Sequence, residues 1–425
     1  MTLLDFKWNY DIEERILDMN INVIGMGYIG LPTALMLACT GMSVVGTDKD
    51  LDKIELLKSK RHTFKEEGLE DLFEDALKND IVFTEEYVNA DVYIIAVPTP
   101  YDKRTRKVIP DYIVDAVNRI VEICKNSSII VVESTISPGT IDKYIRPIID
   151  RENANKGRTI SIVHAPERII PGNMIKELKA NNRIIGVDDK DVGECIRSIY
   201  SRFCDGEIVL TNIRTAELAK VAENTYRDIN IAYANELVKI CREADVNVYE
   251  LIDIANMHPR VNILSPGPGV GGHCISVDPW FLVGDYPEIA NLILTSRKVN
   301  DSMPEYTLKR ISKIMKENDI ERLSDVGLYG LTYKENVDDI RESPTLQLIS
   351  CMDSHAACGV KVYDPYIAKD IVSNQVHNLD EFLNSIKMVV IMVAHDEIIA
   401  NQNKIENHVV LDTRNVTDIV SRYTL

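Results

Sequence analysis

Residues Ile21-Asn22-Val23-Ile24-Gly25-Met26-Gly27-Tyr28-Ile29-Gly30 decide the fold of this chain. A short apolar run is followed at once by the spacing G-x-G-x-x-G, and a helical pattern continues from Leu31 to Thr40. A strand, a glycine turn and a helix in this order form a turn that binds a dinucleotide, because glycines let the backbone approach the pyrophosphate at the positive helix N-terminus. A tight structural turn is the alternative interpretation of the motif.

A second strand strengthens the dinucleotide interpretation. Residues 43–47 form another apolar run that ends at Asp48, about where an acidic side chain binds the hydroxyls of the adenosine ribose. An acid at this position favours NAD over NADP, so we predict NAD as the cofactor. The candidate cofactor-binding residues of this region are Gly25, Gly27, Tyr28, Ile29, Gly30 and Asp48.

Four further apolar runs follow at the spacing of alternating strands and helices. They are residues 92–97, 129–132, 160–163 and 183–187. Continuous apolar runs are typical of parallel strands covered on both faces, and ligands bind at the carboxyl ends of such strands. The loops at these ends supply the candidates Thr99, Thr135, Glu167 and Arg168. Turn and cap chemistry is the alternative for each of them, and it is the interpretation we prefer for Ser137 and Thr140.

A long helix is predicted from Thr215 to about Ala244, where glycine and proline are absent. Lys220 and Asn224 are four residues apart and share one face of this helix with Glu217. A solvated face is the usual explanation for such a pair. Because this helix is largely apolar, a buried lysine and asparagine there would need a purpose, and a catalytic role is the alternative. The helix is also a natural dimer core.

The sequence Ser265-Pro266-Gly267-Pro268-Gly269-Val270-Gly271-Gly272-His273-Cys274-Ile275-Ser276-Val277-Asp278-Pro279 is a loop that presents one thiol. Four glycines and three prolines exclude a stable helix or a central strand. Cysteine is most often a small buried side chain, but in this polar setting exposure for chemistry is the better interpretation. A thiol together with a hydride acceptor indicates oxidation at the aldehyde level, because a thiolate can hold an aldehyde as a thiohemiacetal.

A second alternation of strands and helices follows the thiol loop. Its predicted strands are residues 326–330, 360–363, 388–393 and 409–412, without a complete G-x-G-x-x-G. Lys334 and Arg341 follow the first of them and are candidates to hold phosphates, although surface charges are the commoner case. We therefore predict an α/β fold of two doubly wound Rossmann-like domains joined by a long central helix. The predicted parts are an arm at 1–20, an NAD-binding domain at 21–210, a central helical domain with the thiol loop and dimer interface at 211–318, and a sugar-nucleotide domain at 319–425.

The composition sets limits on partners. The formal net charge of −18 argues against nucleic acid or an anionic membrane as a partner, since both would be repelled. The eight cysteines are scattered without CxxC pairs, so neither a metal site nor a disulfide framework is indicated, and a reducing cytoplasm fits best. Charged residues among the first nineteen interrupt any apolar core that a signal peptide would need.

With these motifs in place, the sequence resembles the UDP-glucose/GDP-mannose dehydrogenase family from Ile21 to the C-terminus. The motifs that carry the resemblance are GMGYIG, ESTISPGT, PERIIPG, AELAKVAENTYRD, GPGVGGHCISVDPW and TYKENVDDIRESP. The histidine directly before the cysteine resembles the branch that acts on UDP-N-acetylhexosamines. Ser276 stands where proline is common in this branch, so we expect a looser loop.

The resemblance implies a role for each matching residue. Cys274 would be the nucleophile, with Lys220 and Asn224 stabilising the oxyanions. Asp278 would pair with Lys220 or hold a water, and Thr135 and Glu167 would orient water, with Glu167 a candidate base. Arg260 would reach the substrate of a neighbouring subunit, Lys334 would contact the sugar nucleotide, and Arg341 the pyrophosphate of the dinucleotide. The implied substrate-binding residues are Glu167, Arg168, Lys220, Asn224, Arg260, Gly271, His273, Tyr333 and Lys334, where His273 either contacts the sugar or packs the loop.

The implied activity is an NAD-dependent four-electron oxidation of the C6 hydroxyl of UDP-N-acetyl-D-mannosamine to the uronate, through a thiohemiacetal and a thioester on cysteine. It implies a homodimer and cytoplasmic polysaccharide biosynthesis. UDP-N-acetylglucosamine or UDP-glucose are alternative substrates. A two-electron hydroxyacid dehydrogenase, in which the thiol is incidental, and a non-catalytic NAD-responsive protein remain the competing interpretations.

Overall fold

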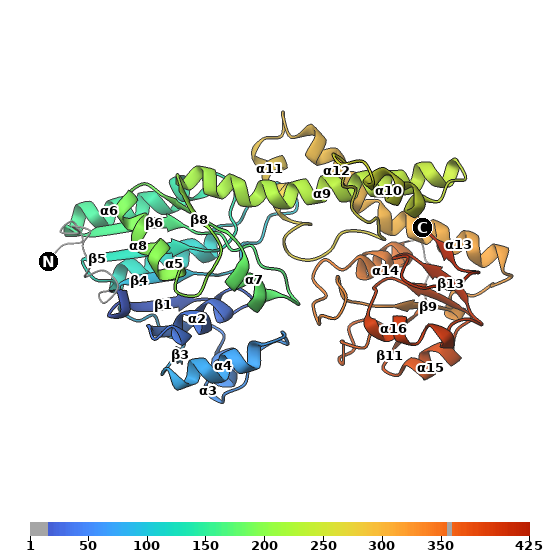
Figure 1. Ribbon diagram of the computed structural model, residues 1–425, viewed down its shortest axis with the longest axis horizontal. Coiled ribbons are helices and arrows are strands. Elements are labelled where there is room, and N and C mark those ends of the chain that lie inside the picture. The colour runs from blue at the N-terminus through green and yellow to red at the C-terminus, as the bar shows by residue number, and fades with distance from the viewer. Residues whose placement is uncertain (1–15, 355–358) are drawn as a thin grey trace. The chain divides into compact units, whose positions relative to one another are not determined.

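The computed structural model describes residues 16–354 and 359–425, so residues 1–15 of the predicted N-terminal arm lie outside it (Figure 1). The chain divides into two compact units at Ala222 and Glu223. The division falls within α9 (Ile213–Glu243), a continuous helix that contributes residues to both units. The predicted helix at 215–244 is therefore confirmed with its ends shifted by one or two residues.

The first unit is built on a sheet whose described strands follow the order β3-β2-β1-β4-β5-β6-β7-β8. The bounds are β1 (Asn20–Ile24), β2 (Ser43–Thr47), β3 (Val82–Thr84), β4 (Val92–Ile95), β5 (Ser127–Val132), β6 (Thr159–His164), β7 (Arg183–Val187) and β8 (Ile208–Thr211). Strands β1 to β6 are parallel in the Rossmann order 3-2-1-4-5-6. The ends of β1, β4, β5 and β6 therefore lie along one edge of the sheet.

One prediction for this sheet was wrong. The apolar run of residues 183–187 was expected to be a parallel strand like its neighbours, but β7 pairs antiparallel to β6. An apolar run reports burial on both faces, which is independent of strand direction. Because of the reversal, β7 begins at the edge where β6 ends.

Helices cover both faces of this sheet. Successive residues of β4 enter two different cores, Val92 and Ile94 on one face, Tyr93 and Ile95 on the other. The first core packs against α2 and α4, the second against α5 and α6. The helices of the unit are α2 (Gly30–Cys39), α3 (Leu51–Lys58), α4 (Leu69–Lys78), α5 (Asp111–Ile123), η2 (Ile141–Ile145), α6 (Arg146–Lys156), α7 (Met174–Ala180), α8 (Lys190–Tyr200) and the start of α9.

The second unit repeats this plan with a smaller sheet. Its described strands follow the order β11-β10-β9-β12-β13-β14, all parallel. The bounds are β9 (Val326–Tyr329), β10 (Lys361–Tyr363), β11 (Gln375–Val376), β12 (Met388–Ile391), β13 (Val409–Asp412) and β14 (Tyr423–Thr424). Residues of β12 again alternate between two cores. The predicted pair of doubly wound domains with a long helix between them is confirmed.

The remaining helices of the second unit precede or flank its sheet. They are α10 (Val248–Asn256), α11 (Asp278–Asp285), α12 (Asn291–Asp301), α13 (Met303–Glu317), η3 (Leu323–Asp325), α14 (Pro344–Ser354), α15 (Leu379–Asn384), α16 (Asp396–Ala400) and η4 (Gln402–Lys404). The thiol loop joins α10 to α11. In the part of the chain that the structure describes, no helix is long and apolar enough to cross a bilayer.

Candidate active site

The glycine turn between β1 and α2 has the local structure that a pyrophosphate requires. Gly25 has φ +94°, and a Cβ there would lie 2.6 Å from the Ala96 carbonyl oxygen. A Cβ on Gly30 would overlap the Gly25 carbonyl, so this glycine allows close packing of the helix on the strand. A Cβ on Gly27 would meet nothing within 4 Å. The backbone at Gly27 is therefore open to a ligand at the N-terminus of α2, and the turn fits a dinucleotide.

The predicted ribose-binding acid lies directly beside this turn. Asp48 accepts a hydrogen bond of 2.8 Å from the Met26 backbone N–H, which joins the end of β2 to the turn. Its carboxylate also forms an ion pair of 2.7 Å with Lys53. Of the other two turn candidates, Ile29 is the N-cap of α2, and the ring of Tyr28 packs on Phe64 with centroids 4.4 Å apart.

The loops after β4 and β5 are tied to each other. The Ser134 hydroxyl donates to the Val97 carbonyl at 2.7 Å, which holds Thr135 next to the segment of Thr99. Thr99 is buried and Thr135 half-buried. The Thr140 hydroxyl donates to the Ser137 carbonyl at 2.6 Å, so the turn chemistry that we preferred for this pair is confirmed.

Glu217 has a structural task at the same loop. Its carboxylate accepts hydrogen bonds from the backbone N–H groups of Gly139 at 2.5 Å and Ile141 at 3.0 Å. The start of α9 is thereby fixed to the loop that carries Thr135. These two hydrogen bonds explain why a glutamate lies on the same face of the helix as Lys220.

A buried charge cluster surrounds Glu167 at the edge where β5 and β6 end. Arg183 forms an ion pair of 2.6 Å with Glu167 and lies 3.8 Å from Glu133. The Tyr200 hydroxyl donates to Glu133 at 2.6 Å, and the Thr33 hydroxyl donates to the same carboxylate at 3.3 Å. Burial raises the pKa of Glu133 to about 7, although Arg183 opposes the shift. Burial works against the charge of Arg183, but the two carboxylates hold its pKa above the usual value.

Arg168 forms two hydrogen bonds next to this cluster. Its backbone N–H donates to Glu167 at 2.6 Å, while its guanidinium donates to the Asn182 carbonyl at 3.1 Å. The backbone of Arg168 therefore helps to fix Glu167. A substrate contact of the Arg168 side chain stays a prediction.

Lys220 and Asn224 are both buried on α9, one turn apart. Lys220 belongs to the first unit and Asn224 to the second. In the second unit the Asn224 amide donates to the Asp278 carboxylate at 2.6 Å. The predicted alternatives for Asp278 were a pair with Lys220 or a held water, and neither foresaw this bond. Both side chains of the pair on α9 are thus buried rather than on a solvated face, and their catalytic role stays a prediction.

The thiol loop packs closely on the loop that follows β9. A Cβ on Gly271 would lie 2.6 Å from the Glu342 carbonyl oxygen and 2.7 Å from the Tyr333 Cβ, and Gly272, with φ +85°, faces the Tyr333 ring. Glycine is required at both positions because the two backbones approach so closely. His273 follows Gly272 in the sequence, and Cys274 comes next. The Cys274 side chain is exposed.

Two further hydrogen bonds hold the thiol loop. The Gly272 N–H donates to the Arg341 carbonyl at 2.9 Å, and the Asp278 N–H at the start of α11 donates to the Cys274 carbonyl at 2.8 Å. Ser276 is buried, and its hydroxyl donates to the Gly272 carbonyl. The hydroxyl thus adds a hydrogen bond that proline lacks, and the looser loop that we expected from serine in place of proline stays a prediction.

The loop of residues 331–343 carries the predicted sugar-nucleotide side chains. Lys334 is partly exposed on it, and the Arg341 guanidinium binds both oxygens of Asp339 at 2.9 and 3.0 Å through Nε. Burial, and then Arg341, lower the pKa of His273, which places this histidine close to the same loop. Arg260 is exposed after α10, where its N–H donates to His258. The ligands of these residues stay predictions.

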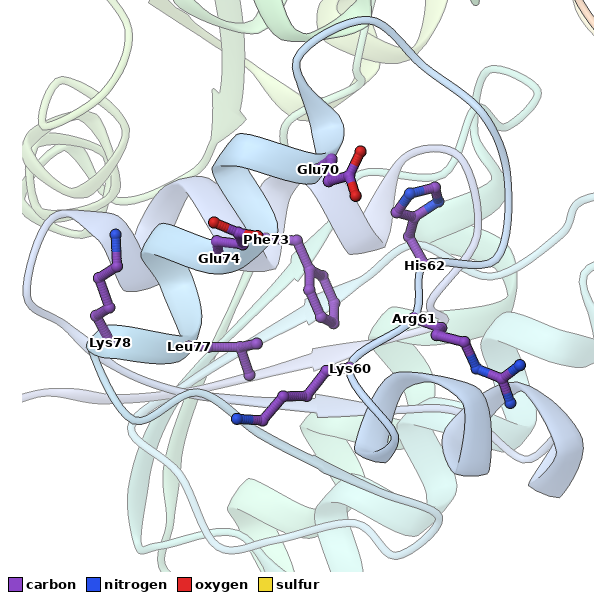
Figure 2. A pocket seen from close by; sticks show the side chains of 8 residues that line it. All are labelled: Lys60, Arg61, His62, Glu70, Phe73, Glu74, Leu77 and Lys78. Carbon is purple, nitrogen blue, oxygen red and sulfur yellow. The ribbon is translucent and has the colours of Figure 1, made fainter.

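An open pocket lies elsewhere on the first unit. It has a volume of about 670 Å³ and contains none of the predicted site residues. Figure 2 shows Phe73 and Leu77 of α4 projecting toward the segment of Lys60, Arg61 and His62. Most of its charged lining residues are exposed.

Three residues of the charge cluster were not recognised from sequence: Glu133, Arg183 and Tyr200. A signal existed for two of them. Glu133 directly follows a continuous apolar strand, and Arg183 is a charged residue at the first position of another. Tyr200 at the end of α8 has no such signal. Within residues 16–354 and 359–425, no group of three or more His, Cys, Asp or Glu side chains could hold a metal ion.

Comparisons with known proteins cover almost the whole chain. Family models described as UDP-glucose/GDP-mannose dehydrogenase match in three parts: the NAD binding domain at residues 19–204, the central domain at 214–302 and the UDP binding domain at 327–419. NAD is therefore the cofactor, as predicted, and the glycine turn lies within the domain matched to it.

Individual relatives agree with these matches. The UDP-N-acetyl-D-mannosamine dehydrogenase of Methanocaldococcus jannaschii is 41% identical over 95% of this chain and 94% of its own. The NDP-N-acetyl-D-galactosaminuronic acid dehydrogenase of Ralstonia nicotianae is 37% identical over 94% and 97%. Among solved structures, the UDP-N-acetyl-mannosamine dehydrogenase of Staphylococcus aureus has a TM-score of 0.85 at 38% identity, covering 95% of this chain and 98% of its own.

Proposed function

The chain belongs to the UDP-glucose/GDP-mannose dehydrogenase family, and we propose that it oxidises the C6 hydroxyl of UDP-N-acetyl-D-mannosamine to UDP-N-acetyl-D-mannosaminuronate. The observation that carries the proposal is the exposed thiol of Cys274 on a loop packed against the loop after β9, four residues before Asp278. Relatives with this activity in their names are about 41% identical along the chain, which supports this sugar.

The reaction needs two oxidations at one carbon. The glycine turn between β1 and α2 would hold NAD, which would supply the hydride acceptor for both oxidations. After the first, the Cys274 thiolate adds to the C6 aldehyde and forms a C–S bond, giving a thiohemiacetal. Loss of the second hydride leaves a thioester. Water then forms a bond to C6 as the C–S bond breaks, so the uronate leaves, the thiol returns, and four electrons have been removed.

The buried polar residues would stabilise negative charge and accept a proton during these steps. Lys220 and Asn224 would stabilise the negative oxygen on C6 in the adduct, with Asp278 orienting the Asn224 amide through their 2.6 Å hydrogen bond. Glu167 would take the proton of the attacking water, with Thr135 orienting that water. The covalent bond retains the aldehyde while spent cofactor is exchanged.

The second unit would bind the sugar nucleotide. Tyr333 and Lys334 lie on the loop that contacts the thiol loop, so UDP bound there would present its sugar near Cys274. His273 and Gly271 line the same contact, Arg341 is proposed for the dinucleotide pyrophosphate, and Arg260 for the substrate of a neighbouring subunit.

The direct test counts product. Purified protein with NAD and UDP-N-acetyl-D-mannosamine should yield two NADH per uronate, and one NADH would favour a two-electron hydroxyacid dehydrogenase. Parallel reactions with the UDP forms of N-acetylglucosamine, N-acetylgalactosamine and glucose test the sugar. Cys274→Ser should abolish uronate formation, whereas Cys241→Ser, at a buried cysteine, should not. NAD binding without NADH from any sugar would indicate a non-catalytic protein.

We also propose a homodimer formed along α9. Three large side chains at seven-residue intervals, Tyr226, Tyr233 and Ile240, are 62%, 54% and 55% exposed on the helix surface. A seven-residue interval places them on one stripe, which suits a helix that packs against its own copy. Light scattering should give a dimer mass for the wild type and a monomer mass for Tyr233→Lys. Equal masses for the two proteins would reject this interface.

We further propose a cytoplasmic location. The eight scattered cysteines without CxxC pairs favour a reducing compartment. The proposed sugar-nucleotide chemistry belongs to polysaccharide biosynthesis. Fractionation of cells with an antibody against the chain would test the location.

A further inference from the structure

The charge cluster around Glu167 contains an arginine to which the proposed reaction assigns no task. The exposed fractions of Glu133, Glu167 and Arg183 are 1%, 6% and 5%, and Tyr200 is fully buried. The Arg183 guanidinium lies 4.6 Å from the centroid of the Tyr200 ring and 5.1 Å from that of Phe203. Two carboxylates therefore share one cation in a site closed by aromatic rings.

The sheet topology places Arg183 opposite Glu167. In the antiparallel pair of β6 and β7, Val163 faces Val187 and His164 faces Gly186. Continuing this register three residues beyond β6 sets Glu167 across from Arg183, consistent with their 2.6 Å ion pair. A parallel β7 would have put its first residue at the opposite edge. The reversal of β7 is thus what delivers a cation to the end of β6.

Burying these charged side chains costs free energy of folding, which suggests that they are kept for a purpose. A buried ion pair is often no more stable than apolar residues of the same volume, because both charges lose their hydration. One arginine also cannot fully neutralise two carboxylates, and here the deficit falls on Glu133, whose pKa burial raises to about 7. Glu133 faces Arg183, Glu167, Tyr200 and Thr33, so its charge bears directly on the Arg183–Glu167 pair.

We propose that Arg183 is a positioning residue that fixes the carboxylate of Glu167, the proposed base for hydrolysis of the Cys274 thioester, while Glu133 shares the guanidinium. The inference rests on the proposed function. Arg183 touches neither substrate nor cofactor in this scheme. In hydrolysis the water proton passes to Glu167, the new C–O bond forms at C6 and sulfur leaves. Without Arg183, the Glu167 carboxylate would lose the partner that fixes its position, and this last step alone would slow.

The test separates hydrolysis from the oxidations. For Arg183→Gln we expect a rapid burst of two NADH per active site, then turnover slower by about 100-fold, the size of a general-base contribution. Intact-protein mass spectrometry during turnover should show the uronyl adduct on Cys274. Arg183→Lys keeps the charge and should recover about tenfold of the loss. Arg197→Gln is the matched control, since Arg197 pairs with Glu194 at the surface of α8, and it should match the wild type.

Glu133→Gln provides a second, nearly isosteric variant if the arginine variants do not fold. It leaves the guanidinium to Glu167 at every pH, so the inflection of the hydrolysis rate near neutrality should vanish. The proposal would be overturned if Arg183→Gln lost the NADH burst and the turnover in equal proportion and formed no adduct on Cys274. It would also be overturned if Glu133→Gln kept the pH profile of the wild type. Failure of the wild type to form two NADH would reject the proposed function instead, so the two failures are distinguishable.

Discussion

The turn after β1 and the turn after β9 are built alike, although they lie in different units. Gly25 and Gly330 have φ +94° and +98°, and each ends the first strand of its sheet. In both units an aspartate at the end of the neighbouring strand accepts hydrogen bonds from the turn. Asp48 binds the Met26 N–H at 2.8 Å, and Asp364 binds the N–H groups of Leu331 and Thr332 at 2.6 and 3.0 Å.

The two turns differ in the segment that connects the glycine to the next helix. After Gly25 the helix α2 begins at Gly30, so backbone N–H groups form the ligand site. After Gly330 the helix α14 begins only at Pro344, and the intervening loop presents side chains and contacts the thiol loop. A shared turn therefore does not determine the ligand. The segment between the turn and its helix does, and this distinction can be tested.

The largest effect is expected from closing the first turn. Gly27→Val places a side chain in open space, so the unit should fold, but the pyrophosphate can no longer approach the backbone. We expect NAD affinity to fall about 1,000-fold, or about 4 kcal/mol, with UDP affinity unchanged. Calorimetric titration with each ligand measures both values. Loss of UDP binding would show that the two turns are not separate sites.

The reciprocal change is Gly271→Ala in the second unit. Its Cβ would press on the Glu342 carbonyl and Tyr333 and displace the thiol loop. A displacement of this kind should lower the rate of uronate formation by about 100-fold while NAD affinity is kept. Gly41→Ala carries the strain of a positive φ but its Cβ meets no neighbour, so it is the control for a loss of stability without displacement of the thiol loop. If Gly271→Ala formed the uronate at the wild-type rate, the contact between the two loops would not be needed for the proposed site.

The equivalence of the turns themselves predicts matched stability losses. Gly25→Ala brings a Cβ within 2.6 Å of the Ala96 carbonyl oxygen, and Gly330→Ala within 2.5 Å of the Val393 Cβ. With the strain of positive φ, each should lower the free energy of unfolding of its own unit by about 2 kcal/mol. Hydrogen exchange resolved by unit measures the loss. A loss in only one unit would show that the turns are alike in backbone angle alone.

The smallest expected effect is an opposite pH response of the two buried acids. Burial raises the pKa of Glu133 to about 7, so its contribution to stability is full below about pH 4.3 and is lost as pH rises through about 7. Burial opposes ionisation of Asp364, but the hydrogen bond from His395 holds its pKa below the usual value. The contribution of Asp364 is therefore present above about pH 3.9 and is lost as pH falls further.

Melting temperatures from pH 3 to 8 would check this contrast. Glu133→Gln should flatten the alkaline side and Asp364→Asn the acid side. If the dependence of melting temperature on pH were unchanged in both variants, neither acid would set the pH response of its unit.

Much of the fold could be predicted from the sequence because buried parallel strands have continuous apolar runs. The runs that end at Asp48 and at Asp412 were predicted within a residue or two. The edge strands β3, β8, β11 and β14 were missed, since they are two to four residues long and include exposed or half-buried positions. The direction of β7 was also missed, because an antiparallel strand with both faces buried has the same pattern.

The candidate site, too, could be predicted from the sequence only in part. Motif spacing and family resemblance located Cys274, Asn224 and Asp278, and the structure joins the last two by a hydrogen bond. The ion pair of Arg183 with Glu167, and with it the proposed role of Arg183, depends on the direction of β7, which no local pattern encodes. The Asn224–Asp278 bond likewise depends on how α11 meets α9, a tertiary feature that joins residues 54 positions apart in sequence.

The exposure of Cys274 has a practical consequence. Of the seven cysteines in the described part of the chain, four are buried, Cys39 and Cys351 are half-buried, and Cys274 alone is open to solvent. An alkylating reagent should consume this sulfur first, and sugar nucleotides should slow the labelling. Under the proposed mechanism, titration with such a reagent would count competent catalytic centres in a preparation, and an electrophile mounted on a UDP scaffold would be a rational starting point for an inhibitor.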